Sequence, residues 1–334
     1  LTESARVAGQ TIQPLVADTM AGIARETTAL QQRVADGVQA QLDGASQRLD
    51  AAVATVSANW ASALAQHDAR STALGDRLDA SYAAWSGGFE QGPPWIDQAK
   101  KMGWVLVAPD FRGPNSRPEA CASDLASQDI VDAVEYAKSH ARIDTDRIYL
   151  VGGSGGGHMS LIMAARVPGL WAGVSAWVPI SDLTAWHAES SARKNNYAKM
   201  IEQCCGGKPG PATEAQYRHR SPLFHLAAAK GVPLDINTGI HDGHTGSVPV
   251  SHSLLAFNVL AAPDKQVSVA DIDFMVRERK IPAALATETQ IDPERQKATL
   301  FRRASGNARV TVFEGGHDSE PSAALEWLSR QRKG

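Results

Sequence analysis

The residue with the clearest chemical potential is Ser154, the centre of a G-x-S-x-G pentapeptide at residues 152–156. An apolar run precedes it at 147–151 and a run with helical character follows at 159–165, which predicts a strand, a sharp turn and a helix. Glycines two positions before and two positions after Ser154 leave room where a Cβ would clash, and such a turn lifts the hydroxyl clear of the sheet. The pattern makes Ser154 a candidate nucleophile. The alternative is a Gly-rich turn that binds a phosphate or only turns the chain.

Two later side chains could activate this serine. A serine hydroxyl becomes nucleophilic when an imidazole accepts its proton, and the imidazole must be oriented by a carboxylate. Asp242 follows a predicted strand at 233–239, and His317 follows the last predicted strand at 308–313. Because the carboxyl ends of parallel strands share one edge of a sheet, we expect these two residues to converge on Ser154. The order Ser, Asp, His is that of α/β-hydrolases.

Other carboxylates compete for the role of the acid. Asp235 lies inside a predicted strand, and Asp318 is adjacent to His317 in sequence. Neither is as well placed as Asp242 to reach the far ring nitrogen of the base. We therefore expect Asp242 to be the acid.

Three more histidines crowd the acid loop, namely His241, His244 and His252. Without carboxylates and histidines at ligand spacing, side chains at the rim of a site are favoured over a zinc site. We expect no metal and no other cofactor.

The elements that must hold these groups alternate between strands and helices after about residue 85. Strands are expected at 103–110, 147–151, 171–181, 233–239 and 308–313, and helical pieces at 95–102, 123–140, 159–165, 249–262, 269–278, 293–303 and 322–330. This alternation predicts an α/β fold with a mostly parallel sheet joined by right-handed crossovers. The irregular, polar stretch 183–226 is expected to form a cap or rim over the site. Residues 263–306 are expected to be an insertion between the acid and the base.

The first 84 residues differ from the rest of the chain. They contain no lysine and a single proline, Pro14, and their apolar residues recur at intervals of three, four or seven. This spacing predicts long helices in a hairpin or a coiled coil, and the composition resembles Ala/Gln-rich coiled-coil segments of bacterial proteins. The segment could form a homo-oligomer through its apolar stripe or fold onto its own globular part. We predict two domains, 1–84 and 85–334.

Several motifs together resemble the catalytic domain of the prolyl oligopeptidase-like branch of the α/β-hydrolases. They are the stretches Tyr149–Met159, Ser221–Leu223, Gly239–Asp242 and Glu314–His317, and the resemblance covers roughly residues 85–328. It implies a serine hydrolase that forms an acyl-enzyme, with Ser154 as nucleophile, Asp242 as acid and His317 as base.

An oxyanion formed during acyl transfer needs two hydrogen-bond donors. The N–H of Gly155, directly after the nucleophile, is expected to supply one. The second normally comes from a loop after an earlier strand, and the candidates are Trp85 and Ser86. However, residues 80–84 form a poor strand and everything upstream is helical, so the early strands of the fold are expected to be missing or replaced. A fusion near residue 84 would account for this.

Three residues are expected to contact the substrate: Gly153, His158 and Trp186. His158 starts the helix after the nucleophile and is expected to line the floor of a pocket. Tryptophans near the site would suit an apolar or sugar-like group, although tryptophans are as often part of the core.

Composition limits the partners. The chain is 43% hydrophobic and 21% charged, with a net charge of −3 and a pI near 6.4, which gives no electrostatic reason to expect nucleic acid or an anionic membrane. No apolar run approaches the roughly 18 residues of a membrane span. The three cysteines are too few for a disulfide framework. We expect a soluble protein; the compartment stays open because the chain begins at Leu1 and a targeting segment could have been removed, with the cytoplasm slightly favoured over secretion.

Three functions fit these observations. The first is a carboxylic ester hydrolase acting on a small-molecule ester, since the related oligopeptidases carry a β-propeller that 84 helical residues cannot form. The second is a small peptidase of the same branch. The third is a coiled-coil interaction protein with an inactive hydrolase remnant, which the missing early strands would explain.

Overall fold

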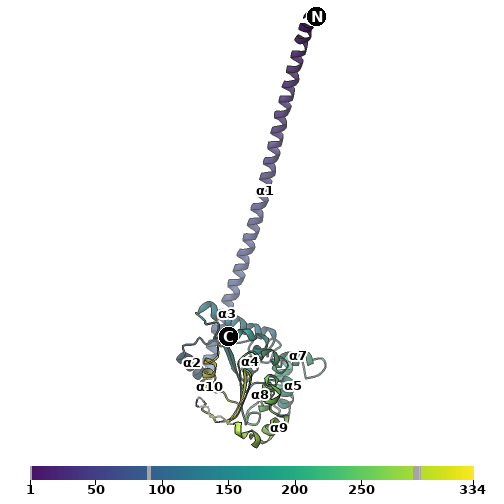
Figure 1. Ribbon diagram of the computed structural model, residues 1–334. Coiled ribbons are helices and arrows are strands. Elements are labelled where there is room, and N and C mark those ends of the chain that lie inside the picture. Colours follow the sequence, from purple (N-terminus) through teal and green to yellow (C-terminus); the bar gives the residue numbers. More distant parts are fainter. Residues whose placement is uncertain (1, 89–91, 289–292, 294) are drawn as a thin grey trace. The chain divides into compact units, whose positions relative to one another are not determined.

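The computed structural model describes the backbone of residues 2–88, 92–288, 293 and 295–334 (Figure 1). The chain divides into two compact units, residues 1–72 and 73–334. The division falls within the first helix, α1, Thr2–Gly88.

Helix α1 is continuous over its 87 residues. Alanine, leucine, glutamine and arginine favour a helix strongly enough to outweigh isolated glycines, each of which costs about 1 kcal/mol. The predicted hairpin is therefore wrong. Apolar side chains along the helix are exposed in the single chain, among them Leu30, Leu49 and Trp60 with exposed fractions of 58%, 65% and 66%. The coiled coil remains a prediction.

The second unit is built on a five-stranded sheet with the order β1-β2-β3-β5-β4. The strands are β1 Tyr149–Gly153, β2 Gly173–Trp177, β3 Leu234–Gly239, β4 Thr299–Ser305 and β5 Ala308–Phe313. Strands β1, β2, β3 and β5 are mutually parallel, and only β4 is antiparallel, paired with β5. The predicted α/β fold with a mostly parallel sheet is confirmed.

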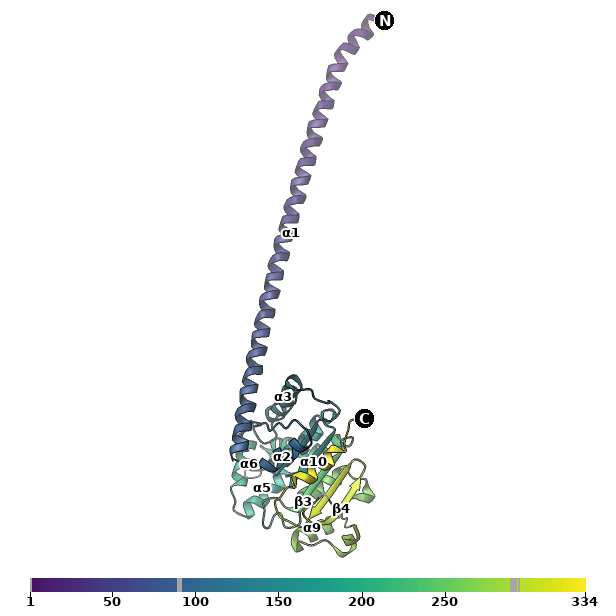
Figure 2. The ribbon, with the colours of Figure 1, turned by 90° about the vertical axis from the view of Figure 1, so that its left-hand side faces the viewer.

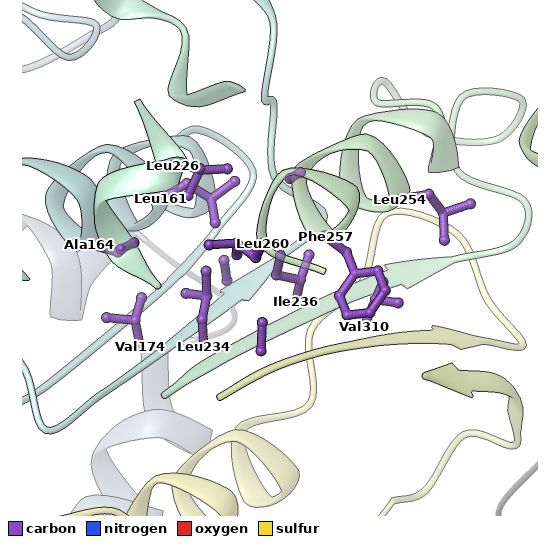
Figure 3. Close-up of a cluster of buried hydrophobic side chains, with 14 of the residues drawn as sticks. Leu161, Ala164, Val174, Leu226, Leu234, Ile236, Leu254, Phe257, Leu260 and Val310 are labelled. Carbon is purple, nitrogen blue, oxygen red and sulfur yellow. The ribbon is translucent and has the colours of Figure 1, made fainter. Parts of the chain in front are cut away.

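Helices cover both faces of this sheet (Figures 1 and 2). Helices α3 (Asp124–His140), α4 (Gly155–Arg166) and α8 (Val250–Leu260) pack on one face, and α2 (Gly92–Lys101) and α10 (Pro321–Ser329) pack on the other. Figure 3 shows Phe257 of α8 beside the strand residue Val310, with Leu254 and Leu260 of the same helix in the same cluster of buried side chains. Strands β2 and β3 are buried at every position, as expected for a parallel sheet covered on both faces.

Three helices form the segment between β2 and β3: α5 Leu183–Ala192, α6 Tyr197–Cys205 and α7 Glu214–Arg220. The sequence predicts irregular structure here, and that prediction is wrong. Asp182 caps α5, because its carboxylate accepts a hydrogen bond from Thr184 N at 2.8 Å. A further helix, α9, spans Val269–Glu278 as predicted.

Two other secondary-structure predictions are wrong. Residues 104–110, expected to be a strand, are irregular, because among the described residues no strand precedes β1 and a strand needs a paired neighbour. Part of the expected helical piece 293–303 is instead strand β4, which turns into β5 at Gly306, where φ is +57°. The absence of described strands before Tyr149 agrees with the expectation that early strands are missing or replaced.

Within the described ranges, none of the helices combines the length and the apolar character that crossing a membrane requires.

Candidate active site

Ser154 occupies a strained turn between β1 and α4. Its φ and ψ are +56° and −117°, a conformation that costs a non-glycine residue about 1–3 kcal/mol. Its backbone is held on both sides: Ser154 N donates to Trp177 O (2.9 Å), and His158 N donates to Ser154 O (2.8 Å). Ser154 Oγ has no hydrogen-bond partner among the residues described. The hydroxyl is therefore presented at the carboxyl end of the sheet.

Close backbone approaches make the glycines around Ser154 necessary, but not all in the predicted places. A Cβ on Gly152 would collide with the backbone of Gly156 and lie 2.8 Å from Ser160 Oγ. A Cβ on Gly156 would meet nothing within 4 Å, which corrects the expectation that the glycine two positions after Ser154 prevents a clash. Gly157 has this role instead, because its Cβ would lie 2.6 Å from the carbonyl oxygen of Trp177.

Asp242 and His317 form a hydrogen-bonded pair beyond the ends of β3 and β5. The two loops run side by side, since His241 N donates to Gly315 O at 2.9 Å. His317 Nδ1 donates to Asp242 Oδ2 at 2.8 Å, and the side chain of Asp242 is fully buried. Because an ionised carboxylate only accepts, Nδ1 must carry the proton and Nε2 of the neutral ring is left free to accept one.

Further hydrogen bonds hold the Asp242 carboxylate in place. Its Oδ1 accepts from Gly243 N at 2.8 Å and from Val248 N at 3.1 Å. A Cβ on Gly246 would collide with Asp242 Oδ1 and lie 2.5 Å from His317 Cβ, so the loop backbone packs directly on the pair.

The competing carboxylates are engaged elsewhere. Asp235 binds Ser175 Oγ at 2.9 Å and Arg309 Nε at 2.6 Å inside the sheet. Asp318 binds Lys297 Nζ at 2.8 Å, and this hydrogen bond, opposed by partial burial, lowers the pKa of the Asp318 carboxyl.

The other histidines of the acid loop have separate partners. His241 Nε2 lies 2.6 Å from Glu314 Oε1, and His244 Nε2 donates to Val276 O at 2.6 Å. His252 Nδ1 accepts from Ser181 N at 3.1 Å, so its Nε2 donates to Glu189. In the described part of the chain, no three His, Cys, Asp or Glu side chains are grouped to hold a metal ion.

A cavity of about 130 Å³ opens beside Ser154. Its lining residues come from helices α5 and α6, the segment before α5, the loop after residue 110 and the start of α4. The lining residues are Asn115, Cys121, Ser154, Gly155, His158, Ile180, Leu183, Trp186, Tyr197, Met200 and Ile201. None of these side chains carries a fixed charge, so the cavity suits an apolar group.

The predicted substrate-contacting residues are placed differently from one another. His158 lines the cavity; its Nε2 donates to Arg220 O at 2.7 Å, and burial lowers the pKa of its imidazole to about 4, so it is neutral at pH 7. Trp186 also lines the cavity, with Nε1 donating to Ser247 O at 2.9 Å. Gly153 is at the exposed end of β1 and does not line the cavity.

The predicted oxyanion donors also differ in where the structure places them. Gly155 is the first residue of α4 and lines the cavity. Trp85 and Ser86 belong to the last turns of α1 and not to a loop, and their side chains lie outside the described residues. N–H groups inside a helix donate to carbonyls four residues earlier, so a donor role for these two residues stays a prediction.

Sequence reasoning did not identify Asn115, Cys121 or the α6 side chains as part of the site. Asn115 had a detectable signal, because it follows Gly113 and Pro114 in a turn-rich loop directly after an apolar run. The α6 side chains had none, because their position depends on how the cap folds back.

Comparison with known families gives two matches. A profile described as "Prolyl oligopeptidase family" (Peptidase S9) matches residues 95–273, which is more than half of the chain and includes Ser154 and Asp242. A profile described as a domain of unknown function (DUF802) matches residues 45–92.

Two curated proteins are similar over part of the chain. The "Uncharacterized peptidase YtmA" of Bacillus subtilis is 28% identical over 166 residues, which cover 49% of this chain and 60% of that protein. "Acylamino-acid-releasing enzyme 1" of Oryza sativa subsp. japonica is 23% identical over 164 residues, covering 46% of this chain and 21% of that enzyme. The chain thus matches less than two thirds of the length of each relative.

Among solved structures, the uncomplexed Pyrococcus horikoshii acylaminoacyl peptidase matches with a TM-score of 0.42 and 18% identity, over 67% of this chain and 30% of that one. An acylaminoacyl peptidase in complex with Z-Gly-Gly-Phe-chloromethyl ketone matches with a TM-score of 0.42 and 19% identity, over 67% and 29%.

Proposed function

The chain belongs to the prolyl oligopeptidase family, and from this premise we propose that it is a serine hydrolase that cleaves amide bonds of small peptide-like substrates through an acyl-enzyme on Ser154. The observation that carries the proposal is the Asp242–His317 hydrogen bond of 2.8 Å, formed at the same sheet edge as the strained Ser154 turn. Two of these three residues lie inside the segment that the family profile matches.

The chemistry follows from these groups. Ser154 Oγ attacks the substrate carbonyl carbon while its proton passes to His317 Nε2, and the carbonyl π electrons move onto the oxygen. Collapse of this intermediate breaks the C–N bond, and the leaving amine takes the proton from His317. Water then repeats the sequence on the acyl-enzyme and releases the acid. Asp242 stays ionised throughout and stabilises the imidazolium.

The cavity beside Ser154 supports a substrate with a small apolar group near the scissile carbonyl. A dry cavity of roughly 150 Å³ accepts benzene, so about 130 Å³ suits a branched aliphatic or small aromatic side chain. An ionised side chain would lose its hydration there without meeting an opposite charge, because His158 is neutral at pH 7.

A peptidase rather than an esterase is proposed because the family description and the names of both relatives are those of peptidases or of acylamino acid release. The sequence alone favours esters. The two alternatives share the acyl-enzyme and differ only in the leaving group.

Labelling with a fluorophosphonate probe tests the mechanism, since rapid reaction needs an activated serine and an oxyanion site. We expect wild-type labelling and none in Ser154→Ala. A wild-type chain that reacts no faster than Ser154→Ala would support the inactive-remnant alternative and remove this proposal.

Paired substrates test the specificity. N-acylated leucine or phenylalanine p-nitroanilide and the matching p-nitrophenyl ester share an acyl group and differ in the leaving group. We expect Ser154-dependent hydrolysis of the anilide, and a much lower kcat/KM when aspartate or lysine replaces the apolar residue. Turnover of the ester alone would favour the ester hydrolase.

A further inference from the structure

The candidate oxyanion site has one well-placed donor. The N–H of Gly155 is at the start of α4, where helix N–H groups have no partner within the helix. Stabilising the negative oxygen of a tetrahedral intermediate takes a second donor from outside this turn. The predicted source, Trp85 and Ser86, lies inside α1, where N–H groups are used by the helix itself.

Asn115 offers a donor in the same cavity. It lies in the loop between residue 110 and α3, and it lines the cavity together with Ser154 and Gly155. Its amide has a defined orientation: Cys121 N donates to Asn115 Oδ1 at 2.9 Å, so Oδ1 must be the acceptor and Nδ2 the opposite end. The backbone N–H of Cys121 can only donate, and it therefore fixes the orientation of the Asn115 amide.

Nδ2 of Asn115 faces the start of α4. It lies 2.9 Å from the position that a Cβ on Gly155 would take. It makes no hydrogen bond to another group among the residues described, so both of its hydrogens are available to a ligand. Asn115 Nδ2 therefore lies beside Gly155, whose N–H is the other donor.

The loop that carries Asn115 is held rigidly. Arg220, itself 5% exposed, donates to Pro118 O and Ala120 O at 2.7 Å and to Cys121 O at 3.1 Å. Arg166 of α4 donates to Ala122 O at 2.9 Å, which ties the same loop to the helix that carries Gly155. A preorganised donor of this kind needs no rearrangement when charge develops.

We propose that Asn115 Nδ2 is the second donor of the oxyanion hole, together with the N–H of Gly155. The inference rests on the proposed function. Asn115 would contact the carbonyl oxygen of the substrate, most strongly when that oxygen becomes negative, and would take the part that the sequence assigns to Trp85 or Ser86.

Two substitutions of Asn115 separate donation from support of the loop. Asn115→Asp keeps an acceptor for Cys121 N but removes the donor and adds a negative charge; Asn115→Ala removes the donor without adding charge. We expect both to lower kcat for the anilide by about 10²- to 10³-fold with little change in KM, and to slow fluorophosphonate labelling in parallel. Ser116→Ala, one residue further along the loop, is the matched control and should behave like wild type.

A double-mutant cycle provides a second readout. Gly155→Ala retains its own N–H, but the added Cβ pushes Asn115 Nδ2 aside. It should therefore lower kcat in the wild-type background and have little further effect in Asn115→Ala. Purely additive effects would contradict the proposal.

The outcomes separate this inference from the function on which it rests. An active wild type whose Asn115→Asp variant labels and turns over as fast overturns the role of Asn115 and leaves the hydrolase proposal standing. Loss of activity in Asn115→Ala with normal activity in Asn115→Asp shows that the side chain only supports the loop, and it overturns the inference as well. A wild type that neither labels nor hydrolyses overturns both.

Discussion

The two halves of the candidate site are built in different ways. The nucleophile corner, residues 152–158, is held by backbone: Ser154 has a φ of +56°, and glycines permit the close contacts around it. The acid–base corner, residues 239–248 and 313–318, is held by side-chain hydrogen bonds, with both oxygens of Asp242 occupied. The acid–base corner therefore depends on the hydrogen bonds of one side chain as well as on the close packing of Gly246, whereas the nucleophile corner depends on backbone conformation.

This difference determines whether a substitution in each corner should change activity alone or activity and stability together. In the acid–base corner, a substitution that changes one atom's hydrogen-bonding character should remove activity and leave the fold intact. In the nucleophile corner, a substitution that adds one carbon should act on stability and geometry together.

The largest effect is expected from Asp242→Asn. The amide can donate where the carboxylate accepts, which would favour the wrong tautomer of His317, and kcat should fall by about 10⁴-fold. Steady-state anilide hydrolysis measures this, with thermal unfolding as the check on folding. Asp318→Asn is the matched control and should lose less than tenfold; equal losses would show that Asp242 has no special role.

An effect of roughly 3 kcal/mol is expected from His158 in acid. Burial lowers the pKa of its imidazole from 6.5 to about 4, so between these values the unfolded chain binds a proton that the folded chain does not. Its contribution to the free energy of unfolding is complete above pH 6.5 and declines as the pH falls toward 4. Urea unfolding at pH 7 and pH 4.5 should show a smaller decrease in His158→Gln, whose amide can still donate to Arg220 O. The same decrease in both proteins would contradict the prediction.

Gly246→Ala should displace the Asp242–His317 pair by steric overlap, without changing any hydrogen-bonding group. The added Cβ would collide with Asp242 Oδ1 and crowd His317 Cβ, and a displacement of about 1 Å costs about 10²-fold in rate. kcat of the anilide and the free energy of unfolding are the measurements. Gly231→Ala, where a Cβ meets nothing within 4 Å, is the control and should keep wild-type rates. An unchanged kcat in Gly246→Ala would mean that the loop shifts to accommodate the Cβ without displacing Asp242 or His317.

The smallest effects are expected from two neighbouring glycines of α4. Gly157→Ala should destabilise the fold by about 1–3 kcal/mol, since its Cβ would lie 2.6 Å from Trp177 O. Gly156→Ala should be neutral or stabilise by up to about 1 kcal/mol, because alanine favours a helix and the position is open. Denaturant unfolding of both variants measures this. The reverse order would show that the pentapeptide motif, and not the packing, identifies the essential glycine.

The same contrast explains what the sequence could predict. The acid–base pair was found because Asp242 and His317 carry distinctive chemistry and follow strands whose ends share one sheet edge. Asn115 was not singled out, because its donor is significant only once Cys121 fixes the amide and Gly155 lies beside it. These relations arise from tertiary structure, which residue spacing does not encode.

The fold shows a similar limit. Residues 104–110 have the composition of a buried strand, but composition cannot reveal that none of the described strands pairs with them. Strand β4 was missed although a Gly-Asn turn at 306–307 links it to β5, which is a hairpin signal. The helical cap was missed because its helices are short and depend on contacts with one another.

Arg220 links three parts of the site: helix α7, the loop that carries Asn115, and the start of α4. Its guanidinium binds three carbonyl oxygens of the Asn115 loop, while its own carbonyl accepts from His158 in the first turns of α4. Local unfolding of α7 would therefore break the hydrogen bonds that hold the Asn115 loop and the His158 imidazole at the same time. The cap, the loop and the start of α4 should consequently open and close as one cooperative unit in native-state hydrogen exchange, so partial unfolding would remove the whole substrate side of the site together.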